Sequence, residues 1–163
     1  MNMQQYLVET FRFNDAANRA MIEKVKELPD PSNSIRHLSH LINSQIKWMA
    51  RIQQDPQASR LSWWEPVYEY HQLVKAWEAS LHPWLEMMSS ISAEDIHREM
   101  LFVGKDEGWW SASLIDIALQ LNYHSIHHRA QIQVFIREQG IEPEFIDYIG
   151  TRYVKRSLVV QSS

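Results

Sequence analysis

The sequence predicts an all-α protein, folded as a four-helix bundle. Four long stretches carry apolar residues at helical spacing, and one long connection separates the second stretch from the third. Glycine is scarce: the 163 residues contain only four, and none lies in the first 103. Because tight hairpin turns favour glycine, this scarcity argues against a β fold rich in turns. We therefore expect one helical domain over residues 1–163.

The first two helices are expected in the stretches 3–28 and 33–52. The first apolar pattern stops before Pro29, which removes a backbone donor and cannot continue a helix. The second pattern begins near Asn33 or Ser34, and either side chain could cap the helix. The two helices should have similar lengths.

The third helix is expected over 66–88, with Pro66 at its first position, where a missing N–H costs nothing. Pro83 lies inside this pattern and predicts a kink or an early end. Between 91 and 110 the helical periodicity fails, and an apolar run before a glycine-containing turn indicates a short strand or hairpin.

The fourth helix is expected to begin near Ser111 or Ser113 and to end at Gly140. Ser113 is followed three residues later by Asp116, which resembles a capping box. This helix carries the residues on which the functional hypothesis depends.

Composition excludes several functions. Sixteen Lys and Arg against 20 Asp and Glu give a net charge of −4, and no basic block is present, so nucleic acid is not an expected partner. With no cysteine there is no disulfide, zinc finger or cysteine nucleophile. Neither glycine-rich phosphate-binding motif occurs. The polar N-terminus and the lack of an apolar run of about 18 residues predict a cytoplasmic protein without a membrane partner.

Two histidines in the fourth helix suggest a metal site. His124 and His128 are four residues apart, so they share a helix face, and both replace apolar residues in the stripe that should face the core. A metal ion would satisfy both buried imidazoles at once, although two hydrogen-bonded core histidines would show the same pattern. His127 points elsewhere on the wheel. A third ligand is needed, and the pattern alone leaves His37 and His40 both open.

Other metal or nucleophile motifs fit less well. A ferritin-like di-iron site needs two Glu-x-x-His pairs, and the only one, which ends at His97, lies in the irregular segment. The sequence contains no His-Glu-x-x-His zincin motif and no Gly-x-Ser-x-Gly elbow.

Two segments resemble the DinB-like, or YfiT-like, family of metal-binding four-helix bundles. Residues 122–131, Asn-Tyr-His-Ser-Ile-His-His-Arg-Ala-Gln, are similar to the family signature of a histidine followed four residues later by His-Arg-x-Gln. Residues 34–48 are similar to the family's second helix, in which the ligand histidine precedes a leucine and stands eight residues before a tryptophan. The resemblance implies an up-down-down-up bundle, often dimeric, with one divalent metal ion held by His40, His124 and His128.

The resemblance also implies a function. Relatives include metal-dependent hydrolases and thiol-dependent transferases, so the nucleophile would be a metal-bound water or thiolate, and the partners a small-molecule substrate, a low-molecular-weight thiol and a second copy of the chain. Zinc or nickel is expected, with iron or manganese also compatible. The alternative is a non-catalytic bundle stabilised by metal, or a dimeric stress-related binding protein. Gln45 stands where relatives often have glutamate, which argues against an acid/base role there.

Further residues have a structural and a functional interpretation. Arg129 could contact an anion or form an internal ion pair, and Asn14 and Asn18 could hydrogen-bond a ligand histidine. Aromatic residues could wall a pocket or simply pack the helix ends: Trp48, Trp63, Trp64, Trp109, Trp110 and Tyr123.

Overall fold

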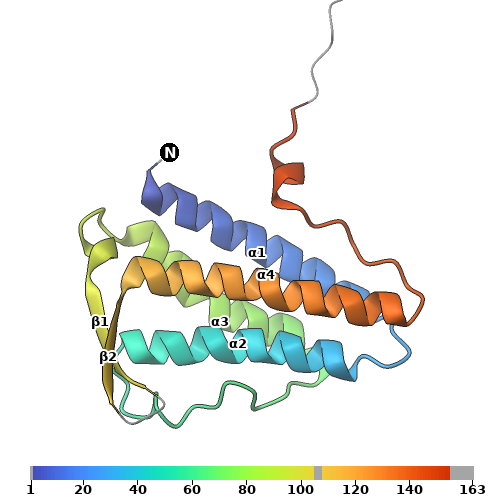
Figure 1. Cartoon of the computed structure of the whole chain (residues 1–163), viewed down its shortest axis with the longest axis horizontal. Coiled ribbons are helices and arrows are strands. Elements are labelled where there is room, and N and C mark those ends of the chain that lie inside the picture. Colours follow the sequence, from blue (N-terminus) through green and yellow to red (C-terminus); the bar gives the residue numbers. More distant parts are fainter. Residues whose placement is uncertain (1, 105–107, 155–163) are drawn as a thin grey trace, which may run out of the picture.

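The computed structural model describes residues 2–104 and 108–154, which form a four-helix bundle closed at one end by a β-hairpin (Figure 1). The helices are α1 (Met3–Val25), α2 (Ser32–Ile52), α3 (Tyr70–Ser90) and α4 (Leu114–Glu138). Following the colours along the chain, α1 and α4 run in one direction and α2 and α3 in the other. The predicted up-down-down-up bundle is confirmed. In the described ranges, no helix has the length and apolarity to cross a membrane.

Helix α4 is placed between α1 and α2. Both α1 and α2 pack against α3 and α4, whereas α1 and α2 make few contacts with each other. The core between the helices contains Phe11 stacked on Trp84, with ring centroids 5.8 Å apart, and the fully buried Trp77. Each side of α4 therefore faces a different helix, which matters for its polar residues.

Two predicted helix starts differ from the structure. Helix α2 begins at Ser32, and Pro31 is its N-cap, so neither Asn33 nor Ser34 caps it. Helix α3 begins at Tyr70 and not at Pro66, which follows a cis peptide bond in the connection from α2. Helix α3 begins behind a local cap, since the Glu69 N–H donates to Oε1 of Gln72, 3.0 Å away, and α2 begins one residue before the first predicted cap.

Pro83 does not end α3, which continues to Ser90. Leu81, two residues before it, and Trp84, directly after it, are buried at 3% and 0% exposure. Their burial offsets the hydrogen bond that proline removes. The early end that the sequence suggested is therefore wrong.

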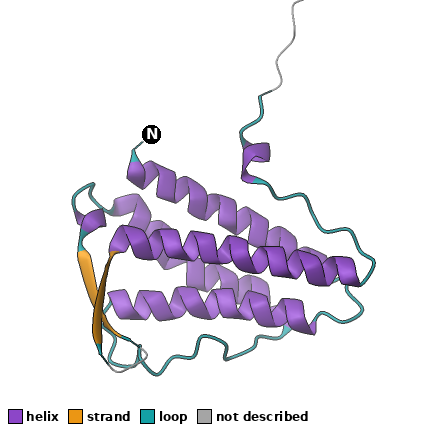
Figure 2. Cartoon of the chain, in the orientation of Figure 1, coloured by secondary structure: helices purple, strands orange, loops and turns teal. Residues whose placement is uncertain are grey.

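The expected hairpin is present just before α4. Strands β1 (Glu99–Val103) and β2 (Trp109–Ser113) are antiparallel, and β1 packs against α2 (Figure 2). The tip of its turn, residues 105–107, lies outside the described residues. As expected, the Ser113 side chain caps α4 by accepting a hydrogen bond from the Asp116 N–H, 3.2 Å away. The hairpin thus leads directly into α4.

Candidate metal centre

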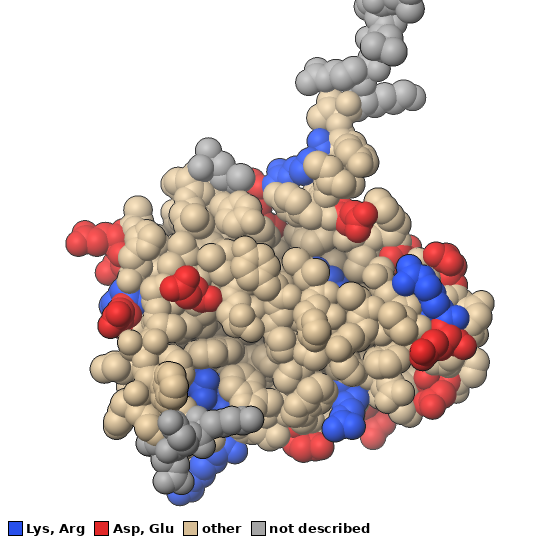
Figure 3. Space-filling model, viewed as in Figure 1, with Lys and Arg blue, Asp and Glu red and all other residues tan. Residues whose placement is uncertain are grey.

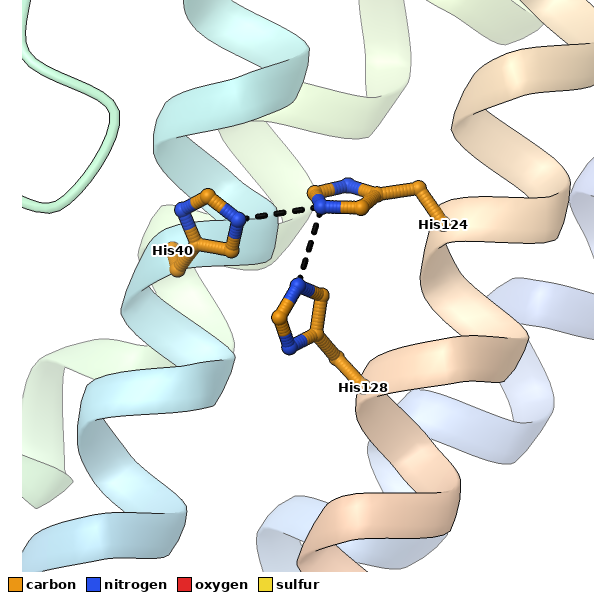
Figure 4. A group of neighbouring side chains, drawn as sticks. All are labelled: His40, His124 and His128. Carbon is orange, nitrogen blue, oxygen red and sulfur yellow. Dashed lines mark hydrogen bonds between the residues drawn. The ribbon is translucent and has the colours of Figure 1, made fainter.

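Three histidines from two helices meet between α2 and α4. His124 and His128 lie one turn apart on α4, and His40 faces them from α2 (Figure 4). One ring nitrogen from each lies within 4.8 Å of the other two. The Nε2 atom of His124 is 3.0 Å from Nε2 of His40 and 2.9 Å from Nε2 of His128. We call these three residues the histidine centre.

The local sequence explains why these side chains converge. Leu121 and Ile132 belong to the buried stripe of α4, and His124 and His128 continue that stripe between them. Helix α2 packs on this face, and His40 lies on its buried side. The core-facing position that the apolar pattern predicted for both α4 histidines is where the structure places them.

Hydrogen bonding alone cannot satisfy this arrangement. A ring nitrogen of neutral histidine carries either one hydrogen or one lone pair, so Nε2 of His124 can serve only one of its two neighbours. A metal ion accepts a lone pair from all three nitrogens. Tetrahedral zinc with nitrogen ligands at 2.0–2.1 Å separates them by about 3.3 Å, so the two short pairs would widen by a few tenths of an ångström, and all three nitrogens already lie within 4.8 Å of one another. The donor set therefore fits a divalent metal.

The connection between α2 and α3 supports His40. Its Nδ1–H donates to the backbone carbonyl oxygen of Trp63, 2.6 Å away, which leaves Nε2 as the lone-pair nitrogen facing the centre. The indole of Trp64 stacks on the imidazole, with centroids 3.9 Å apart and planes 11° from parallel. Trp64 is the predicted aromatic residue that contacts the centre most directly.

His37 lies behind His128 and outside the group of three. Its Nδ1 is 2.8 Å from Nδ1 of His128, and when the Nδ1–H of His128 is the donor, Nε2 of His128 carries the lone pair that faces the centre. The sequence pattern had left His37 and His40 both open, and the structure brings His40 to the α4 pair. His127 is exposed, as expected, with its ring centroid 5.0 Å from that of His128, and it does not belong to the group of three.

Burial keeps the centre uncharged. Desolvation, reinforced by the neighbouring imidazoles, lowers the pKa of His124 to about 4 and that of His128 to about 3. Desolvation also lowers the pKa of His40. At neutral pH all three rings are therefore neutral, which is the form that binds a metal ion.

The other polar candidates lie on the face of α4 that packs against α1. Arg129 donates from Nη1 to Oδ1 of Asn14 at 2.6 Å and to Oγ of Ser125 at 2.8 Å. Asn18 donates to the same Ser125 hydroxyl. Asn14 and Asn18 therefore do not hydrogen-bond a ligand histidine, and the ion pair expected for Arg129 is absent from the described residues. Asparagine and serine oxygens replace the carboxylate.

Gln45 and the remaining aromatic residues have structural roles. The Oε1 atom of Gln45 accepts a hydrogen bond from the Ser80 hydroxyl, 2.8 Å away, so this side chain contacts α3 and does not belong to the histidine centre. Trp48 packs against Trp63 and Phe102. Trp109, Trp110 and Tyr123 are exposed, so they do not wall the centre.

Sequence reasoning missed the contribution of the backbone of Trp63. A main-chain carbonyl carries no residue-specific signal, and the connection that contains it has no regular periodicity.

In the comparison with known proteins, a family model described as the DinB family matches residues 3–158. No curated protein and no solved structure matches the chain.

Proposed function

The chain belongs to the DinB family, and on that premise we propose that His40, His124 and His128 bind one divalent metal ion for catalysis on a small molecule. The convergence of three neutral imidazole nitrogens carries this proposal. Three histidine ligands leave a coordination position open, as in catalytic and unlike structural zinc sites. Zinc or nickel is the proposed ion, and iron or manganese has a compatible preference for imidazole.

An ion bound in this way lowers the pKa of a water or thiol that it coordinates, and so supplies a nucleophile near neutral pH. The chain's own residues orient the ligands: the Trp63 carbonyl holds His40, and His37 holds His128. His124 is only partly buried, so the centre can be reached from solvent. We therefore propose a metal-dependent hydrolase or a thiol-dependent S-transferase, with a low-molecular-weight thiol as cosubstrate in the second case.

Elemental analysis tests the site. Purified wild-type protein should contain one metal ion per chain, whereas His40→Ala and His124→Ala should contain none. His82→Ala is the matched control, because His82 is exposed on α3. Metal retained in both ligand variants would contradict the site, and loss in His37→Ala but not in His40→Ala would assign the α2 ligand to His37.

A spectroscopic titration separates the two reactions. In the cobalt-substituted protein, addition of a small thiol should change the visible spectrum if the cosubstrate is a thiolate. A spectrum unchanged by every thiol would rule out the transferase. If chelation lowers the melting temperature but no turnover depends on the metal, the alternative holds and the ion only stabilises the bundle.

We further propose that residues 1–163 are one domain and that the chain forms a homodimer. Both follow from the resemblance of its helices to the family, whose bundles are often dimeric. Light scattering coupled to size-exclusion chromatography would measure twice the chain mass of 19.3 kDa for the dimer.

A further inference from the structure

A second polar hollow lies beside α2, away from the histidine centre's three ligands. It is a cavity of about 600 Å³ between the C-terminal half of α2, the connection that follows α2 and the end of β1. Three cations line it, Lys47, Arg51 and Arg60, together with the indole of Trp63. Figure 3 shows Lys and Arg atoms at the lower left corner, where in Figure 1 the hairpin meets this connection. We call this cavity the basic pocket.

The two cations from α2 are one turn apart and partly removed from water. The Nζ atom of Lys47, which is only 6% exposed, donates to the carbonyl oxygens of Ser59 and Leu61. Nη2 of Arg51 donates to the Val103 carbonyl oxygen at 3.2 Å. Its Nε–H is buried and has no hydrogen-bond partner. The Nε–H group of Arg51 is thus a buried hydrogen-bond donor without an acceptor.

Aromatic rings surround the same cations. The guanidinium carbon of Arg51 is 4.7 Å from the Trp48 ring centroid and 5.1 Å from that of Trp63, and Nζ of Lys47 is 4.8 Å from the Trp63 ring. The rings attract the cations but carry no negative charge to neutralise them. A planar ligand could pack against the indole of Trp63.

No carboxylate neutralises these cations within the described ranges. None of the ion pairs there includes Lys47, Arg51 or Arg60, although the chain has more acidic than basic residues. Asp55 lines an adjoining hollow with Arg51 but makes no ion pair with it. Desolvation and the charge of Arg51 lower the pKa of Lys47. Close, partly desolvated cations are unfavourable unless an anion joins them.

We propose that the basic pocket binds a small organic anion, in which a carboxylate or phosphate group is attached to a planar body. Arg51 and Arg60 would hold the anionic group, because guanidinium donors match carboxylate and phosphate oxygens. Trp63 would contact the planar body. Trp63 also accepts the hydrogen bond from His40 through its backbone, so the pocket and the histidine centre share this residue.

Titration by NMR tests the proposal. The ¹⁵N-labelled protein is titrated with benzoate and, separately, with inorganic phosphate, at an ionic strength held constant with chloride. The indole N–H signal of Trp63, assigned from its loss in Trp63→Phe, should shift in a saturable manner. Arg51→Gln should weaken binding at least about tenfold, because it removes a charged hydrogen-bond donor. Arg60→Gln, an exposed position, should weaken binding without affecting the fold.

The controls separate this pocket from the metal site. Arg12→Gln changes an exposed cation on α1 and should bind the anions as wild type does. His124→Ala should also keep anion binding, even where it loses metal. Saturation by benzoate and not by phosphate would support a carboxylate on a planar body, and saturation by both would support the anion site with either group, whereas saturation by phosphate and not by benzoate would overturn the role of the planar body. No saturable shift with either probe, unchanged affinity in both arginine variants, or loss of binding in His124→Ala would overturn the proposal.

Discussion

Helix α4 has a buried polar cluster on each of two adjacent faces, and protein atoms alone satisfy the hydrogen bonding of only one of the two clusters. Towards α1, Nη1 of Arg129 donates to oxygens of Asn14, Asn18 and Ser125, and none of these four residues has a buried side-chain polar atom without a partner. Towards α2, the histidine centre brings together three nitrogens that cannot all pair. Burial penalises both clusters, so the difference lies in whether protein atoms alone can satisfy them.

The two faces of α4 have different expected roles, the α1 face in the stability of the bundle and the α2 face in metal binding. His128 and Arg129 are neighbours in sequence but about 100° apart on the helix, so they face different partners. The neutral oxygens around Arg129 replace a counterion, and burial lowers its pKa to about 10, still well above neutral pH. We expect the α1 face to stabilise the bundle with or without metal, and the α2 face to be stabilised when an ion is bound.

Removing Arg129 should have the largest effect on stability. Arg129→Met leaves Oδ1 of Asn14 without its donor and removes one of the two donors to the Ser125 hydroxyl, and we expect the free energy of unfolding to fall by about 3 kcal/mol. Urea denaturation measures this loss. Metal content should not change, because the variant leaves the histidine centre intact.

Arg12→Met is the control for that change, since Arg12 is an exposed residue of α1 that makes no hydrogen bond to Arg129 or its partners. Its unfolding free energy should match that of wild type. If Arg129→Met instead lost its metal at unchanged stability, the two faces of α4 would not be separate.

Metal removal should have the next largest effect, confined to the α2 face. With metal at about one hundred times its Kd, binding adds about 2.7 kcal/mol to stability, and a chelator should abolish this gain. His124→Ala should show no difference between metal-loaded and chelated samples. Equal chelation effects in wild type and His124→Ala would show that the stabilising ion binds elsewhere.

The next prediction concerns His37, which contacts the proposed ligand His128 but is not one of the three proposed ligands. His37→Ala removes the partner of Nδ1 of His128, and we expect metal affinity to fall by about 10- to 100-fold while one ion still binds at saturation. Competition with a chromophoric chelator measures the affinity. His127→Ala, at an exposed neighbouring position, should bind metal as tightly as wild type, and an equal loss there would contradict the specific role of His37.

The smallest effect is expected from mild acidification of chelated protein. The folded pKa values of His124 and His128, about 4 and about 3, lie below the unfolded value of 6.5. The unfolded state therefore binds more protons, so stability is retained above pH 6.5 and falls as pH decreases through the range between these values. The urea midpoint should decrease from about pH 7 to about pH 6, and the decrease should be smaller in His128→Asn. An equal pH dependence in the two proteins would assign it to other groups.

The sequence predicted most of the fold because its signals are local. Helical periodicity of apolar residues depends on neighbours within one turn, and it located all four helices, whereas the loss of that periodicity indicated the hairpin before the last one. The ends were less predictable: Pro66 and Ser34 have the chemistry of helix starts, but α3 begins at Tyr70 behind the Glu69 cap and α2 begins at Ser32.

The candidate site also combines features that one helix determines with features that depend on tertiary contacts. By itself the sequence determined that His124 and His128 share a buried face, because a spacing of four residues is a property of one helix. The apolar pattern left His37 and His40 both open, the family resemblance selected His40, and the structure brings His40 to the pair. Only the tertiary structure decided that the Trp63 carbonyl orients His40 and that Arg129 pairs with amide and hydroxyl oxygens in place of a carboxylate. These contacts join residues far apart in the chain, and they depend on how one helix is rotated against another, which no local pattern encodes.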